Sequence, residues 1–228
     1  TGVDPEVAKE IASRLGIKQV EWRLCEFSTL LTGLVQGQYD VVAAGVFITP
    51  ERQQWAAFSR PTFQARPALL VQSGNPRRLH SYADIGHDPT VRVAVIGGSV
   101  EEVCLLKLGL PAARLIQVPD ARTGRILVDT AQADALALSA PTIRSMILRK
   151  KVNQAAMAEP FEEPASQAGP GVADVGFAFR KEDEALRAAW DRELEAFLGS
   201  EQHVQLISQF GFTTQDLPAK NIPNQATH

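Results

Sequence analysis

The sequence predicts an α/β protein built from two αβ units. Strand-like and helix-like segments alternate from the first residues onward, as in βαβ units around a parallel sheet. Two extended runs, near residues 65–72 and 174–179, connect one series of elements to the other. Two crossings mean that the second lobe is inserted into the first. We therefore expect a first lobe in residues 1–68 and 177–228, tail included, and an inserted lobe in residues 69–176.

The first lobe should begin with a helix, because Asp4-Pro5-Glu6 places a capping residue before a proline at the first helical position. The next elements are expected in the order strand, helix, strand and helix, at 20–25, 30–37, 40–44 and from Thr49 onward. Near the end of the chain, apolar residues at helical spacing predict two amphipathic helices, 186–197 and 204–210.

The inserted lobe repeats the alternation. Strands are expected at 91–96, 115–118 and 135–138, and helices at 99–108, 121–129 and 141–150. In such folds, ligands bind outside the carboxyl ends of the strands, where the helices begin. The strand-to-helix turns are therefore the places to look for binding residues.

Composition argues against several classes of function. Residues with hydrophobic side chains make up 45% of the 228 positions and charged residues 21%, which is ordinary for a globular protein. The net charge is -3 and no basic stripe occurs, which disfavours nucleic acid and membrane surfaces as partners. No apolar run approaches the ~20 residues that cross a bilayer. No leader with an apolar core occurs, so we expect any signal segment to lie outside this sequence.

Catalytic and metal-binding patterns are absent from the sequence. The four histidines occupy surface-type positions without a partner at metal or triad spacing, and no phosphate loop or dinucleotide fingerprint occurs. Cys25 and Cys104 are expected to be small buried side chains rather than a disulfide. The acidic pairs Glu101-Glu102 and Glu162-Glu163 are interpreted as helix caps and solvated charge. We expect no enzymatic activity, no metal and no cofactor.

The turn at residues 44–52 carries the first candidate. Thr49 is expected to cap a helix that starts at Pro50, which places Arg52 in its first turn. A cation there opposes the helix dipole at a cost of about 0.3–1 kcal/mol unless an anion offsets it. The guanidinium could clamp a carboxylate through two parallel hydrogen bonds. A surface arginine paired with Glu51 explains the local pattern equally well.

The turn at residues 97–102 carries the second candidate binding site. Ser99 and Glu102 form the pattern of a capping box, and Gly98 would let a ligand approach the backbone. A well-made helix start explains the same residues without a ligand.

Two phenylalanines stand at strand ends. Core packing is the default interpretation for Phe27 and Phe47. At the mouth of a cleft their faces would instead suit a delocalised cation, with ~0.5–2 kcal/mol for each desolvated contact.

Four segments, in order over nearly the whole chain, carry a family resemblance: residues 1–12, 39–61, 97–99 and 133–135. Thr49-Pro50-Glu51-Arg52, followed by Phe58-Ser59-Arg60-Pro61, is the most specific of these patterns. The chain resembles the polar amino-acid-binding proteins of ABC importers, which have the type II periplasmic binding fold. The resemblance implies that Arg52 holds a ligand carboxylate, helped by backbone groups near Gly45 and Ser99.

At two positions the chain departs from the usual pattern of amino-acid binders, and these departures narrow the choice of ligand. Phe47 stands where amino-acid binders usually have Ser or Thr, and Ser139 stands where they usually have an aspartate for the α-ammonium group. A buried ammonium without its carboxylate is costly, so an ordinary α-amino acid is disfavoured. The ectoine- and hydroxyectoine-binding subfamily is similar at Glu26-Phe27, at Phe47, at Arg52 and over residues 74–85.

That resemblance implies an aromatic cage around the delocalised cation of the ligand, with Phe27 and Phe47 as two of its walls. The resulting set of candidate ligand-binding residues is Glu26, Phe27, Gly45, Phe47, Arg52, Gly98, Ser99, Val100, Glu101, Ser139 and Thr142. The expected function is that of a periplasmic or other extracytoplasmic receptor that passes a small zwitterion to the membrane permease of an ABC importer.

Other interpretations stay open. The same fold could bind a polar amino acid or a betaine, could act as a prephenate or arogenate dehydratase with Glu101 as general acid, or could be the sensor domain of a receptor kinase. The family's first strand precedes residue 1, and its absence would expose a sheet edge. We therefore expect a mostly monomeric protein with reduced stability or edge pairing with another chain.

Overall fold

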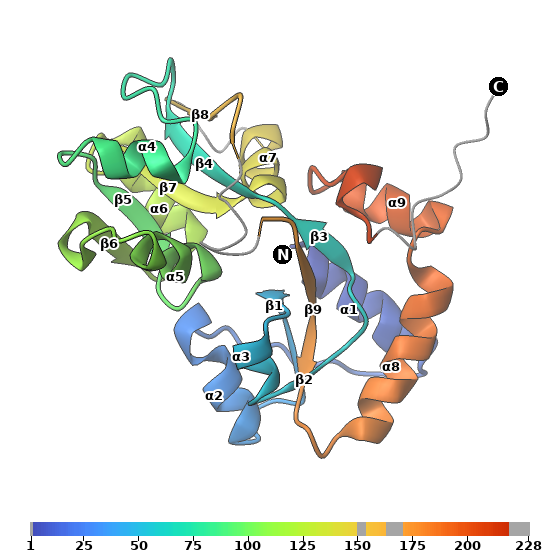
Figure 1. The fold of residues 1–228 in the computed structure, drawn as a ribbon. Helices are drawn as coiled ribbons and strands as arrows, with labels where there is room; N and C mark the ends of the chain where they lie inside the picture. The colour runs from blue at the N-terminus through green and yellow to red at the C-terminus, as the bar shows by residue number, and fades with distance from the viewer. Residues whose placement is uncertain (1, 150–153, 163–170, 219–228) are drawn as a thin grey trace. The chain divides into compact units, whose positions relative to one another are not determined.

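The computed structural model describes residues 2–149, 154–162 and 171–218, which form two compact units (Figure 1). Unit 1 comprises residues 1–25, 29–64 and 173–228, and unit 2 comprises residues 26–28 and 65–172. Unit 2 therefore begins before the sequence-based boundary at residue 69, and unit 1 resumes before residue 177.

The sheet of unit 1 is built around one central strand. β9 (Ala173–Phe179) lies between β1 (Val41–Phe47) and β2 (Ala57–Phe58), and it also pairs with β3 (Phe63–Ala65). Both β1 and β2 run antiparallel to β9, with Val41 and Ala57 each opposite Phe179. The parallel sheet expected from the alternation of elements is therefore wrong for these pairs.

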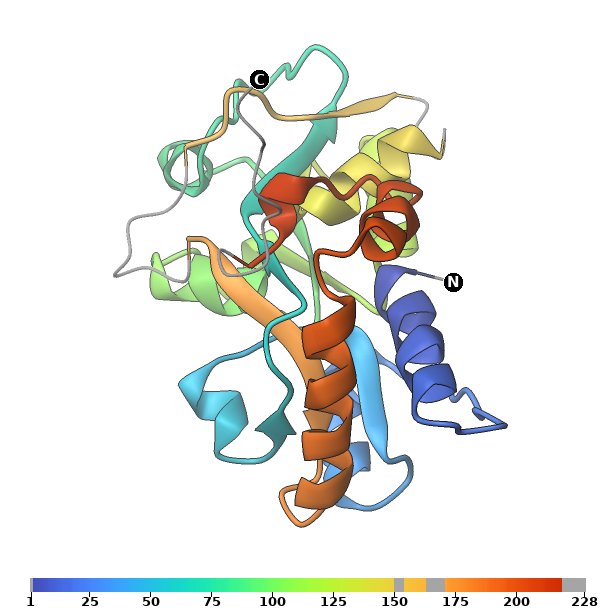
Figure 2. The same ribbon diagram turned by 90° about the vertical axis from the view of Figure 1, so that its right-hand side faces the viewer.

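In the described part of unit 1, the α-helices are α1 (Val3–Arg14), α2 (Leu30–Val35), α3 (Pro50–Gln53), α8 (Glu184–Phe197) and α9 (Glu201–Ser208). α1 packs against both α8 and α9, and Figure 2 shows α1 and α8 running side by side. Trp190 of α8 meets the rings of Phe177 and Phe179 edge-on, at centroid distances of 5.6 and 5.8 Å. The apolar stripe predicted for α8 is confirmed as a packing surface.

The strand predicted at residues 20–25 is not formed. These residues lie outside any helix or strand, and residues 16–24 are all exposed. A strand needs a hydrogen-bonding partner, and residues 18–25 make no backbone–backbone hydrogen bond within the described part of the chain. Phe27, expected to follow a strand, instead begins a short 3₁₀ segment, Phe27–Thr29.

Unit 2 contains a mixed sheet in the order β6 (Leu115–Val118), β5 (Val93–Ile96), β7 (Ala135–Ser139), β4 (Pro67–Gln72) and β8 (Ala155–Met157). β5 runs parallel to both β6 and β7, as the alternation predicted. β4 is antiparallel to β7 and β8, and this pairing places residues 67 and 68 in unit 2.

Helices cover both faces of this sheet: α4 (Tyr82–His87), α5 (Val100–Lys107), α6 (Ala121–Asp129) and α7 (Ala140–Leu148) (Figure 1). Alternate strand residues enter different cores, since Leu69 and Val93 pack with α4 and α5, whereas Leu70 and Ala94 pack with α6 and α7. Strands buried on both faces explain the continuous apolar runs in the sequence. Lys150, the expected last residue of α7, lies outside the described residues. Among the described residues, no helix has the length and apolar character needed to cross a membrane.

Candidate functional site

The turn after β1 is organised by its helix cap. The hydroxyl of Thr49 accepts a hydrogen bond from the backbone N–H of Arg52 at 3.3 Å, and Pro50 is the first residue of α3. The cap satisfies one of the backbone donors that a helix start leaves without a partner. The predicted local structure of this turn is confirmed.

Arg52 folds back onto the end of the strand. Its Nη1 donates a hydrogen bond to the carbonyl oxygen of Phe47 at 3.1 Å. A guanidinium carries five N–H donors, so holding one carbonyl is compatible with clamping a carboxylate. Phe47 is buried and Arg52 is partly buried. Arg52 and Phe47, the cation and the aromatic residue predicted from the sequence, therefore lie in one turn of unit 1.

Gly45 has a partner that the sequence did not indicate. The register of β1 is irregular between Val42 and Val46, and Gly45 adopts a left-handed φ of 66° there. A β-carbon at this position would lie 3.6 Å from Oδ2 of Asp4. Burial raises the pKa of Asp4 to about 7, although hydrogen bonds from the backbone of Asp4 and Gly45 act in the opposite direction. The backbone of Gly45 thus holds a buried carboxyl group of the protein itself.

The turn after β5 carries the predicted cap in a modified form. The hydroxyl of Ser99 accepts from the backbone N–H of Glu102 at 3.2 Å, as expected. The Glu102 carboxylate reaches the N–H of Gly98 at 2.7 Å, whereas the N–H of Ser99 donates to the carbonyl of Ile96 at 3.0 Å. The reciprocal half of the predicted capping box is therefore displaced by one residue. Glu102 also accepts from the side chain of Gln117 on β6.

Gly98 brings the Phe27 segment to this turn. Gly98 has a φ of 76°, and a β-carbon built on it would lie 3.2 Å from the Cα atom of Ser28. Only glycine combines this backbone conformation with such a close approach. Phe27 is partly exposed and Glu26 is exposed. Two candidate segments that are distant in the sequence therefore meet in unit 2.

Ser139 and Thr142 lie at the neighbouring strand end. Ser139 is the last residue of β7, which runs parallel to β5, so both strands end at the same edge of the sheet. The hydroxyls of Ser139 and Thr142 are 2.8 Å apart and hydrogen-bond to each other. Ser139 is 9% exposed. This strand end therefore carries a neutral pair of hydroxyl groups.

Glu101 is a buried acidic residue near Tyr82 and Cys104. It is 6% exposed, and with burial its charge raises the pKa of Tyr82 and of Cys104. For Cys104 the pKa reaches about 11, with burial as the larger cause. Val100, the first residue of α5, is partly exposed. The two neighbouring candidates thus differ in their access to solvent.

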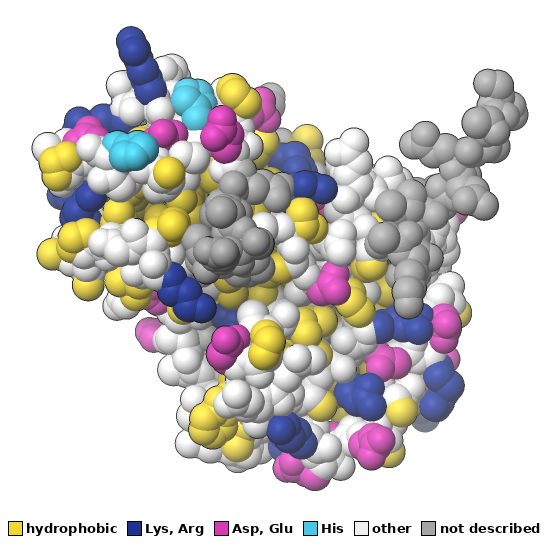
Figure 3. All heavy atoms as spheres, in the orientation of Figure 1, with side chains coloured by type: hydrophobic (Ala, Val, Ile, Leu, Met, Phe, Trp, Pro, Cys, Tyr) yellow, Lys and Arg dark blue, Asp and Glu magenta, His cyan; other side chains and the backbone are white. Residues whose placement is uncertain are grey.

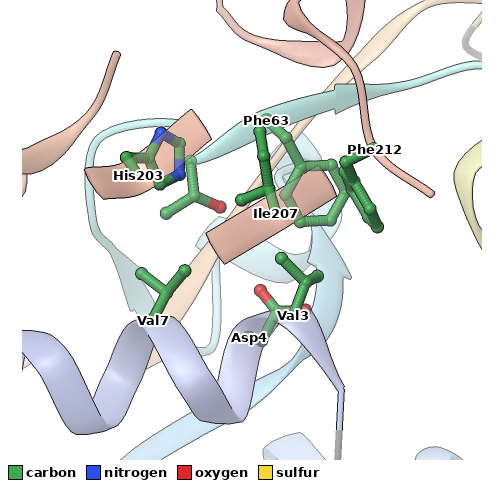
Figure 4. A pocket seen from close by; sticks show the side chains of 8 residues that line it. Val3, Asp4, Val7, Phe63, His203, Ile207 and Phe212 are labelled. Atoms are coloured by element: carbon green, nitrogen blue, oxygen red, sulfur yellow. The ribbon is translucent and has the colours of Figure 1, made fainter. Parts of the chain in front are cut away.

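A small cavity in unit 1 has Asp4 in its wall, the residue that also lies beside Gly45 (Figure 4). Its walls are Val3, Asp4, Val7, Thr62, Phe63, His203, Ile207 and Phe212. Its volume of about 10 Å³ is enough for roughly one water molecule, so it is not a solute site.

His203 in this wall corrects the sequence analysis, which placed all four histidines at the surface. It is 1% exposed, and burial lowers its pKa to about 4. Its Nδ1 accepts a hydrogen bond from the backbone N–H of Gly199 at 3.1 Å. The position in the first turn of α9 resembled a solvent-facing helix start, and only tertiary packing reveals its burial.

Among the described residues, the charged side chains do not gather into a metal site. On the face drawn in Figure 3, basic and acidic side chains of the described residues are interspersed rather than gathered by sign. Within the described residues, no group of three or more His, Cys, Asp or Glu side chains is arranged to hold a metal ion.

Comparisons with known proteins show what the chain as a whole is similar to. The family of bacterial extracellular solute-binding proteins, family 3, matches residues 1–213. The probable amino-acid ABC transporter periplasmic-binding protein y4tE of Sinorhizobium fredii (strain NBRC 101917 / NGR234) is 30% identical over an alignment of 228 positions, which covers 99% of this chain and 74% of that protein.

Two solved structures are similar over almost the whole chain. EhuB in complex with hydroxyectoine is 34% identical, with a TM-score of 0.82 over 93% of this chain and 80% of that one. The ancestral amino acid-binding protein AncCDT-1, described as a precursor of cyclohexadienyl dehydratase, is 26% identical, with a TM-score of 0.78 over 93% of this chain and 86% of that one.

Proposed function

The chain belongs to family 3 of the bacterial extracellular solute-binding proteins, and we propose that it binds a zwitterion of the ectoine type. Its fold is the two-lobed, mixed α/β fold of type II periplasmic binding proteins. As a member of a family of receptors for amino-acid ABC importers, it would deliver the solute to a membrane permease outside the cytoplasm.

The observation that carries this proposal is the hydrogen bond between Arg52 and the carbonyl of Phe47. It holds the guanidinium, the proposed carboxylate-binding group, against the backbone of an aromatic residue in the same turn. A zwitterion with a carboxylate and a delocalised cation needs both kinds of group: paired N–H donors for the carboxylate and an aromatic face for the cation. In the proposed site Phe27 supplies a second aromatic face.

The hydroxyl pair of Ser139 and Thr142 supports a delocalised cation over a compact ammonium. A primary ammonium is strongly hydrated, and transferring it from water without a carboxylate partner is costly. A ring-delocalised cation has a smaller requirement for such a partner. The 34% identity to EhuB, whose structure contains hydroxyectoine, supports the same class of ligand.

A polar amino acid is the second candidate. It is favoured by y4tE and AncCDT-1, which are named as amino-acid-binding proteins. A dehydratase activity has weaker support, because the nominated acid, Glu101, is buried near Tyr82 and Cys104.

Isothermal titration calorimetry with hydroxyectoine, ectoine, arginine and histidine tests the proposal. We expect heat with the first two ligands and none with the amino acids. Arg52→Ala should weaken binding about 10- to 100-fold, as expected for the loss of a charge-assisted hydrogen-bonded pair. Arg122→Ala, at an exposed position on α6, is the matched control and should bind normally. Heat with amino acids alone would overturn the ligand assignment and leave the family membership intact.

A further inference from the structure

The carboxylate of Glu102 links the turn after β5 to strand β6. Glu102 is 8% exposed. One of its carboxylate oxygens accepts a hydrogen bond from the backbone N–H of Gly98 at 2.7 Å, and the other accepts from the side-chain amide of Gln117. The backbone N–H of Glu102 donates to the hydroxyl of Ser99 at 3.2 Å. A single residue therefore bonds to both Gly98 and Ser99, two of the candidate binding residues.

The end of β6 supports this turn from the neighbouring strand. In the parallel pairing of β5 with β6, Val118 lies opposite Ile96, and the backbone N–H of Gly97 donates to the carbonyl of Val118 at 3.2 Å. Gln117, the residue before Val118, adds the side-chain bond to Glu102. A buried carboxylate is costly unless its oxygens have hydrogen-bond donors. Gln117 supplies one of these donors, although it is itself an exposed residue.

We propose that Glu102 and Gln117 are positioning residues for the solute-binding site and act on the solute through the turn that they hold. This inference rests on the proposed function, because Gly98 and Ser99 belong to the proposed site. The hydroxyl of Ser99 accepts from Glu102 and keeps its own proton for donation. Since a hydrogen bond weakens steeply with distance and angle, a small displacement of the turn weakens every bond that it makes to a solute. Gln117 thereby acts on the site without touching the solute.

A double-mutant cycle tests the role of the pair. Gln117→Glu places a second carboxylate beside that of Glu102, and the two like charges disfavour the arrangement that holds Gly98. Glu102→Gln removes this conflict: its amide oxygen can accept from Gly98, and its amide nitrogen can donate to a side-chain oxygen at position 117. Gln117→Glu should therefore raise the dissociation constant for hydroxyectoine about 3- to 10-fold in the original chain. It should have little effect in a chain that carries Glu102→Gln.

Two measurements follow the cycle. Calorimetry gives the dissociation constant, and the NMR resonance of the Gly98 amide reports on the turn without any solute. Gln117→Glu should shift this resonance in the original chain and leave it in place in the Glu102→Gln background. Gln132→Glu, the same substitution at another exposed glutamine of unit 2, should change neither quantity. Circular dichroism checks that each variant is folded during the titration, so a purely structural role would leave the dissociation constant unchanged.

The outcomes separate this inference from the ligand assignment. A Gly98 resonance that does not respond to Gln117→Glu would overturn the inference. So would a shifted resonance with unchanged affinity, or an equal loss of affinity in both backgrounds. If calorimetry finds a polar amino acid as the ligand in place of hydroxyectoine, the ligand assignment fails. The same cycle, measured with that amino acid, then decides whether Glu102 and Gln117 position the site.

Discussion

A β-carbon added to Gly98 would lie only 3.2 Å from the Cα atom of Ser28. The segment that begins with Phe27 therefore lies close to the start of α5, within unit 2. Gly98 also has a left-handed φ of 76°, while its N–H donates to the Glu102 carboxylate. The turn therefore depends on glycine for its conformation and for the space it leaves.

Gly98→Ala should lower the free energy of unfolding by about 1–3 kcal/mol, because a β-carbon is strained at this φ and crowds Ser28. Gly97→Ala is a matched control one residue away: its φ is not positive, and no atom lies within 4 Å of the added carbon. Urea unfolding monitored by circular dichroism compares the two variants. Equal stability of the two would contradict the role assigned to the Gly98–Ser28 contact.

Ser139→Asp should change the ligand preference of the proposed site. The new carboxylate would stand at the end of β7, where it could pair with a compact ammonium group. Aspartate is a good residue for the N-cap position that Ser139 occupies, so the fold should tolerate it. Calorimetry should show weaker binding of hydroxyectoine and new binding of a polar amino acid. Ser73→Asp, at an exposed position near the end of β4, should leave both unchanged.

Local signals predicted the caps and many of the elements. Thr49 and Ser99 cap their helices because hydroxyl acceptors and backbone donors lie within four residues of each other. The pairing of strands that are distant in the sequence was harder to predict. The alternation in residues 20–25 is that of a strand, yet a strand forms only where a partner exists. β8 was missed for the complementary reason, since its three residues are ordered by pairing with β4.

The sequence predicted the turns of the candidate site but not the contacts that their residues make. The turns that carry Arg52 and Ser99 follow from capping patterns. No sequence pattern indicated that Glu102 would reach Gly98, that Asp4 would lie beside Gly45, or that Ser139 would bond to Thr142. These contacts depend on the fold that brings the turns together.

Asp4 should make the protein less stable as the pH rises. Burial raises its pKa from 3.8 to about 7, so between these values the folded state holds a proton that the unfolded state has lost. The free energy of unfolding should therefore fall from about pH 4 to pH 7, by up to about 4 kcal/mol from this group. Asp4→Asn keeps a hydrogen-bond acceptor for Gly45 and removes the titration. Denaturant unfolding at a series of pH values should show that the free energy of unfolding of the variant, relative to the original chain, increases toward pH 7.

His203 should have the opposite effect. Burial lowers its pKa from 6.5 to about 4, so between these values the unfolded state binds a proton that the folded state does not. The stabilising contribution of His203 to the free energy of unfolding is fully present above pH 6.5. It decreases by about 3 kcal/mol as the pH falls toward 4. His203→Gln offers Gly199 an amide oxygen as acceptor without titrating.

The side chains of Asp4 and His203 line the same cavity and titrate over overlapping pH ranges (Figure 4). Between about pH 4 and 6.5 their slopes have opposite signs, so they should largely cancel in the original chain. Relative to that chain, Asp4→Asn should gain stability with rising pH and His203→Gln should gain it with falling pH. The same denaturant series measures both differences. Variant-minus-original curves that are flat, or that tilt in the same direction, would show that these side chains are not buried as described.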